Sequence, residues 1–100
     1  MTQRPIPVRV RHAAHTLGEH LTVWRKLQNL TAEQVAERAG ITRGTLRRLE
    51  NGDPAVGLGV TLSVARALGQ LDQFVAAMDP YESDLGRARA DQRLPQRVRP

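Results

Sequence analysis

The sequence predicts an all-helical protein made of five short helices, and three observations support this prediction. Apolar residues recur at spacings of three and four, which places them along one side of a helix. Aromatic residues make up only 3% of the chain, so the core is built from Leu, Val, Ile and Ala, and Leu and Ala favour helices. Two threonines each open a helix-start pattern, and no segment shows a convincing strand pattern.

The composition narrows the class of protein. A chain of 100 residues is expected to form one compact domain. The absence of cysteine excludes a disulfide framework, a zinc–thiolate site and a cysteine nucleophile, and it fits the reducing cytoplasm in which we expect the protein to act. No apolar run approaches the ~18 residues that a membrane span needs, and the N-terminal residues do not resemble a secretory signal.

The net charge of +5 is unevenly distributed along the chain. An N-terminal arm, residues 1–16, carries three arginines and no acidic residue. The central domain, residues 17–79, carries seven basic and seven acidic residues, whereas the C-terminal tail, residues 80–100, carries five arginines and three acidic residues. The positive excess therefore lies on two arms around a neutral body. Arms of this kind either contact a polyanion or are merely solvated, and the charges alone leave both readings open.

The first helix is expected from about residue 12 to residue 28. Residues 1–11 contain two prolines and no helical period, so they predict a flexible or extended arm. The apolar stripe of the helix follows spacings of four and three. It consists of Leu17, Leu21, Trp24 and Leu27.

Two helix-start signals follow in close succession. Thr31 is a good N-cap with Gln34 three residues later, as a capping box requires, and this helix ends before Gly40, where a positive φ is cheap. Thr42 then repeats the N-cap, and a further helix is expected over 43–50. An Asn-Gly pair stops that helix.

Two more helices are expected over 58–68 and 71–78. Gly59 lies in the first turn of the earlier one and weakens it by up to ~1 kcal/mol relative to alanine. Asp79 and Pro80 close the later one, and the remainder of the tail is polar and rich in arginine.

The link between the two threonine-capped helices points to a function. Two short helices joined by a tight turn that contains glycine form a helix-turn-helix, whose second helix enters a major groove. On a helical wheel of residues 43–50, Leu46 and Leu49 lie on one side. The opposite side holds no acidic residue and consists of Arg43, Gly44, Arg47 and Arg48. The alternative to a DNA-reading helix is a surface helix that is rich in arginine and binds no ligand. The tight turn beside the helix argues against this alternative, because it is the turn of a helix-turn-helix.

Residues 17–69 resemble the Cro/C1-type (XRE) helix-turn-helix family, which has a lambda-repressor-like fold. The resemblance is carried by the stretches LGEHLTVWRKLQNLTAEQVAERAGITRGTLRRLENG and VARALG. It implies a DNA-binding transcriptional regulator that binds double-stranded DNA as a homodimer. One departure stands out, because the family commonly has a phosphate-contacting Gln where this chain has Ala32.

The resemblance also implies roles for single residues. Arg25 and Glu50 match a structural ion pair that ties the first helix to the third. Base-reading positions of the recognition helix match Arg43, Gly44 and Arg48. Positions near phosphates or the groove rim match Thr42, Thr45, Arg47 and Asn51.

Two parts of the chain are candidates for protein contacts. The short apolar stripe of the last predicted helix either completes the core or forms a dimer surface. The C-terminal tail resembles the ends of HipB-like antitoxins in Asp84-Leu85-Gly86 and in residues 94–99, which implies a HipA-like kinase toxin as partner. The candidate contact residues are Leu71, Phe74, Val75, Met78, Leu94 and Arg97.

The sequence contains no pattern typical of an active site. His12, His15 and His20 have no cysteine or carboxylate pair beside them in the sequence, so we expect neither a metal site nor another cofactor. The serines show no nucleophile–base spacing, and the glycines form no phosphate loop, so no catalytic residue is expected. The sequence favours a repressor of its own gene, and the resemblance of the tail implies that this repressor is also the antitoxin of a HipBA-like module. The alternatives are a stand-alone phage-type repressor and a protein-interaction module without specific DNA binding.

Overall fold

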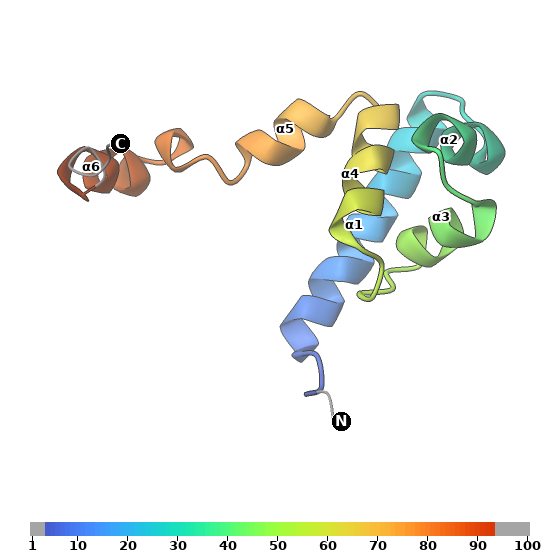
Figure 1. Ribbon diagram of the computed structural model, residues 1–100, viewed down its shortest axis with the longest axis horizontal. Helices are drawn as coiled ribbons and strands as arrows, with labels where there is room; N and C mark the ends of the chain where they lie inside the picture. The colour runs from blue at the N-terminus through green and yellow to red at the C-terminus, as the bar shows by residue number, and fades with distance from the viewer. Residues whose placement is uncertain (1–3, 94–100) are drawn as a thin grey trace.

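The structure, a computed structural model, describes residues 4–93 of the chain and the side chains of residues 4–90. Within this range it contains helices and no strand, which confirms the predicted all-helical fold. The elements follow in the order α1 (Val8–Leu27), α2 (Ala32–Ala39), α3 (Arg43–Glu50), α4 (Leu58–Ala67), α5 (Leu71–Ala76), the 3-10 helix η1 (Pro80–Glu82) and α6 (Asp84–Arg93) (Figure 1).

Helices α1 to α4 form the body of the molecule (Figure 1). Helix α3 packs against α1 and α2, and α4 packs against α2. Burying the apolar side of each helix against the others removes that surface from water, which is the main stabilising contribution to a fold of this size. The buried core consists of Leu21, Val35, Ala36, Leu46, Leu49, Val64 and Leu68.

The predicted starts of α2 and α3 are present in the structure. The Thr31 hydroxyl accepts a hydrogen bond from the Gln34 backbone N–H (3.1 Å), and the Gln34 side chain accepts one from the Thr31 N–H (2.9 Å). Thr42 caps α3 by accepting from the Thr45 N–H (3.1 Å). These caps satisfy backbone N–H groups that a helix leaves unpaired at its start.

Helix α1 begins four residues earlier than the sequence predicted. Residues 8–11 were expected to be extended, but α1 starts at Val8, directly after Pro7. Proline is compatible with a helix start because the N–H that it lacks would be unpaired there. No breaker follows Pro7, so the helix extends from its packed half toward the N-terminus.

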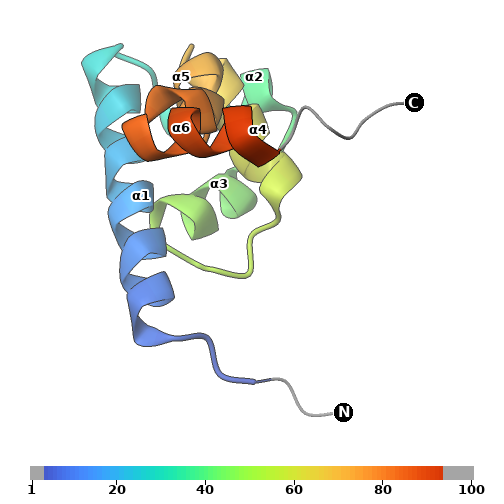
Figure 2. The same ribbon diagram turned by 90° about the vertical axis from the view of Figure 1, so that its left-hand side faces the viewer.

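The C-terminal tail also contains structure that the sequence did not predict. Residues 84–93 form α6, and the Ser83 hydroxyl accepts from the Gly86 N–H (2.9 Å) at its start. Helix α5, η1 and α6, here called the C-terminal projection, leave the body in one direction (Figures 1 and 2). Helix α5 packs against α4, and α6 packs against η1. The tail lacks a clear apolar period, and this is why α6 was missed.

The apolar stripe of α1 is only partly buried. Leu21 is buried and Leu17 is half-buried, but Trp24 and Leu27 are exposed. Helix α5 stands away from the body and does not cover this part of α1. The predicted stripe is therefore buried only in the half that contains Leu17 and Leu21.

We predict that Gly18→Ala destabilises the fold. A Cβ on Gly18 would lie 2.5 Å from the Glu50 carbonyl oxygen and 2.6 Å from that of Leu49, so α1 and α3 would have to move apart. Overpacking of this kind lowers the free energy of unfolding by about 1–3 kcal/mol. Chemical denaturation followed by far-UV circular dichroism measures the change.

Gly59→Ala in α4 is the matched control. Nothing lies within 4 Å of the Cβ that it would add, so alanine should raise the free energy of unfolding by about 0.4–1 kcal/mol. Equal effects of the two substitutions would show that the α1–α3 contact is not tight.

Candidate nucleic-acid interface

The turn between α2 and α3 fixes the angle between the two helices. Gly40 ends α2 with φ +71°, a left-handed conformation that glycine adopts without steric cost. The Ile41 N–H then donates to the Ala36 carbonyl (3.0 Å), and Thr42 begins α3. The connection is therefore as short as the sequence predicted.

Helix α3 has one buried and one exposed side. Leu46 and Leu49 are buried in the core. The residues on the opposite side are exposed, namely Arg43, Gly44, Arg47 and Arg48. The helix therefore presents three guanidinium groups and no carboxylate, and Gly44 leaves its backbone accessible to a close ligand.

Two glycines bring α1 close to the end of α3. Gly18 lies against the backbone carbonyls of Leu49 and Glu50. Gly52 has φ +82° and lies against the backbone of His15. Side chains at either glycine would separate the two helices, so these contacts fix where α3 lies on the body.

An ion pair joins α1 to α3 beside these contacts. Arg25 Nε donates to Glu50 Oε2 (2.8 Å) and Arg25 Nη2 donates to Glu50 Oε1 (3.2 Å), which makes a two-pronged contact. The side chains are only 15% and 13% exposed. The hydrogen bond that Arg25 donates to Glu50 raises the pKa of Arg25 above its ordinary value, against the opposing effect of burial. Arg25 is thus engaged within the fold.

Arg48 is held by a residue that sequence reasoning missed. Its Nε donates to Asp53 Oδ2 (2.9 Å) in the turn after α3. Asp53 Oδ1 also accepts from the Ala55 backbone N–H (2.8 Å). That backbone hydrogen bond, together with Arg48, lowers the pKa of Asp53, so the carboxylate stays ionised at neutral pH. An acid five residues after an arginine is a weak sequence signal, because only the intervening turn brings the two together.

The remaining predicted interface residues lie close to these arginines. Thr42 and Asn51 are exposed at the two ends of α3. Thr45 is half-buried, and its hydroxyl lies 2.9 Å from the Thr42 hydroxyl. Ala32 is half-buried against the core, so the first position of α2 offers no polar contact.

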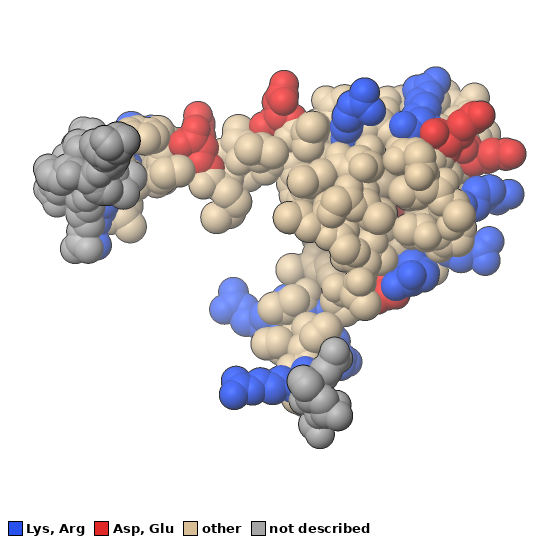
Figure 3. Space-filling model, in the orientation of Figure 1, with Lys and Arg blue, Asp and Glu red and all other residues tan. Residues whose placement is uncertain are grey.

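Figure 3 shows where charged side chains lie on one face of the molecule. Basic side chains lie over the N-terminal half of α1 and around the margin of the body, and acidic ones lie along the near part of the C-terminal projection and beside basic ones at one margin of the body. Arg9 and Arg11 are exposed on the first turns of α1. Among the described residues no group of three His, Asp or Glu side chains is arranged to hold a metal ion.

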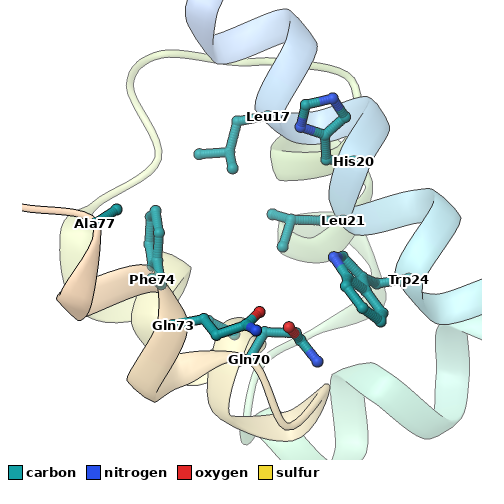
Figure 4. A pocket seen from close by; sticks show the side chains of 9 residues that line it. Leu17, His20, Leu21, Trp24, Gln70, Gln73, Phe74 and Ala77 are labelled. Atoms are coloured by element: carbon teal, nitrogen blue, oxygen red, sulfur yellow. The ribbon is translucent and has the colours of Figure 1, made fainter. Parts of the chain in front are cut away.

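An apolar groove separates α1 from α5 (Figure 4). It has a volume of about 230 Å³, and side chains from both helices point into it. Phe74 lines it together with Leu17 and Trp24, while the dimer candidates Val75 and Met78 are exposed elsewhere on the projection. Leu71 is half-buried, whereas Leu94 and Arg97 lie outside the described residues.

A family model described as "Helix-turn-helix domain" matches residues 16–78. The chain belongs to this helix-turn-helix family. The matched range contains α2, the turn and α3, together with the helices that support them. Comparisons with curated proteins and with solved structures found no match. Family membership and the exposed arginines of α3 together indicate a DNA-binding protein. In the part of the chain that the structure describes, no helix is long and apolar enough to span a membrane.

We predict that Glu50→Ala strongly destabilises this helix-turn-helix protein. The substitution leaves the Arg25 guanidinium largely buried without its carboxylate, which costs about 3–5 kcal/mol of the free energy of unfolding. Thermal and denaturant unfolding measure the loss.

Glu19→Ala is the matched control, because Glu19 forms an exposed pair with His15 (3.4 Å). Removing an exposed pair costs less than about 1 kcal/mol. A cost for Glu50→Ala no larger than that for Glu19→Ala would contradict a structural role for the Arg25–Glu50 pair.

Proposed function

We propose that this protein is a sequence-specific transcriptional repressor that reads the major groove with α3 and controls its own gene. The observation that carries the proposal is the division of α3 into a buried leucine side and an exposed arginine side. A helix in a body of balanced charge has no structural need for three cations on one face. The phosphates and base edges of a major groove are the ligands that such a face fits.

Arg43 and Arg48 are the proposed base-reading residues. Arginine binds the O6 and N7 atoms of guanine with two hydrogen bonds, and a good contact is worth ~1–3 kcal/mol of discrimination. Asp53 uses the Nε of Arg48 and leaves its two terminal amino groups available for such a contact. The carboxylate thereby limits the conformations of a long side chain before DNA arrives, which lowers the entropy lost on binding.

The N-terminal half of α1 is proposed to contact phosphates. The side chain of Ala32 cannot supply the phosphate contact that the related family takes from α2, so other side chains must supply it. Arg9 and Arg11 lie on the turns of α1 that precede His15, which lies against Gly52 in the turn after α3. Arginines there contribute affinity without sequence preference.

Two copies are proposed to bind together, with half-sites about one helical turn apart. The resemblance to Cro/C1-type regulators supports this dimer, and exposed Met78 and Val75 offer apolar surface for it. A protein with this role acts in the cytoplasm, at the nucleoid while bound to DNA.

A second candidate is an antitoxin that also restrains a HipA-like kinase. The observation that favours it is α6, which begins at the residues Asp84, Leu85 and Gly86 that resemble HipB-like proteins and presents an exposed leucine. Co-purification with the protein encoded by the neighbouring gene tests this role. Binding of that protein by the full chain, lost on Leu85→Asp, is the expected result, and no binding by either contradicts it.

The repressor proposal is tested with DNA taken from upstream of the gene and with random DNA of equal length, over a series of salt concentrations. We expect a preference of ~10³-fold or more for the upstream DNA, with affinity that falls steeply as salt rises. Equal and weak binding to both would overturn the proposal and leave a protein-interaction module.

We predict that substitutions in α3 and in α1 affect binding in different ways. Arg48→Ala removes discrimination at one base pair, by about 1–3 kcal/mol, because it removes a base contact. Arg9→Ala combined with Arg11→Ala weakens specific and random DNA alike and lowers the slope of log K against log salt by about 2, because two phosphate contacts are lost. Identical behaviour of the two variants would show that the roles are wrongly assigned.

A further inference from the structure

The C-terminal projection leaves the chain unusually extended. The radius of gyration is 16.9 Å, whereas a compact domain of 100 residues has about 13 Å. The chain exposes 7707 Å², whereas a compact monomer of 11.1 kDa exposes about 5,700 Å². The excess is as large as the area that a specific protein–protein interface buries in total, about 1,200–2,000 Å².

Much of the exposed surface on the projection is apolar. Met78 is 83% exposed and Leu85 is 65% exposed, and Val75 and Tyr81 are also exposed. The groove beside Phe74 is open to solvent between α1 and α5 (Figure 4). Large apolar side chains exposed to this extent on one part of a small protein mark an interaction site.

The projection is nevertheless locally well ordered, with capped helices and close packing between η1 and α6. Asp79 caps η1 by accepting from the Tyr81 N–H (2.9 Å), and Ser83 caps α6. Gly86 allows α6 to lie so close to η1 that a Cβ there would overlap the Pro80 carbonyl. A segment with this much local order and so little contact with its own body fits a partner that completes it.

The charges on the projection are segregated in a self-complementary way. Residues 70–86 contain four acidic residues and no basic one, namely Asp72, Asp79, Glu82 and Asp84. Residues 87–93 contain three arginines and one aspartate. Arg87 pairs with Asp84 inside the projection, so the charges left for a partner are those of the other residues. Figure 3 shows acidic side chains along the near part of the projection and basic ones at its far end. When two such segments run antiparallel, the acidic part of each faces the basic part of the other.

We propose that the projection docks onto a second copy of this chain by mutual exchange. A two-fold axis places α6 of each copy against α5, η1 and the α1–α5 groove of the other. This covers the exposed apolar side chains of both copies and pairs their opposite charges, as an isologous interface requires. The inference rests on the dimer of the proposed function and adds how it forms, since α6 lies beyond the family match that ends at Met78.

A charge-swap experiment tests the exchange. The variant Arg87→Glu with Arg89→Glu leaves Arg93 as the one basic residue between residues 70 and 93, and Asp72→Arg with Glu82→Arg makes the projection more basic. We expect the wild type to be a dimer by sedimentation equilibrium, and each variant alone to dissociate at least about tenfold more readily. An equimolar mixture should form a heterodimer at least about tenfold tighter than either variant alone, because like charges then face opposite ones.

Lys26→Glu with Arg38→Glu is the matched control. It changes the net charge as much as the acidic variant does, but on exposed residues of the body, and it should dimerise as the wild type does. Circular dichroism checks that all variants remain helical. A monomeric wild type, variants that dimerise unchanged, or a mixture that stays monomeric would each overturn the exchange.

The same proteins separate this inference from the proposed function. The oligomeric state is measured without DNA, whereas the preference for upstream over random DNA is measured separately. If the charge-swap test fails but the wild type still prefers the upstream DNA, the exchange is wrong and the repressor proposal stands. A wild type that passes the test but shows no DNA preference contradicts the repressor proposal alone.

Discussion

The close packing of α1 against the C-terminal end of α3 is the constraint on which the rest of the structure depends. Gly18 allows the two helices to meet at backbone distance, and the Arg25–Glu50 pair ties them together a short way along α1. With α3 held there, Leu46 and Leu49 enter the core and the arginines necessarily face outward. The surface that we propose to bind DNA is therefore a direct consequence of how the core is packed.

Helix α1 contacts both the helix-turn-helix and the groove that faces α5. One side of it positions α3, and Gln28 near its end donates to the Leu68 carbonyl (2.8 Å) at the end of α4. Another side carries Trp24 and Leu17 into the groove that faces α5 (Figure 4). A second copy seated in that groove, as we propose, would contact the same helix that supports α3, so the proposed dimer and the proposed DNA contact would be linked through α1.

The sequence predicted the features that depend on neighbouring residues. The bounds of α3 and the capping of α2 follow from hydrogen bonds between residues three apart, such as those of Thr31 and Gln34. Features that depend on distant residues were missed or misjudged. The spacing placed Trp24 on one stripe with Leu21 but did not show that Leu21 is buried while Trp24 is exposed. Asp53 was missed because its partner comes within reach only through the fold, and α6 was missed because its stability comes from capping and from contact with η1, not from an apolar period.

Selection of binding sites from a pool of random duplex DNA tests the central claim most directly. The account predicts enrichment of a motif that contains guanines and that recurs as an inverted repeat about one helical turn apart, because two copies of α3 present the same arginines through a two-fold axis. A pool that remains random after repeated selection would contradict the claim, since it would show that the arginines of α3 bind DNA only through its charge.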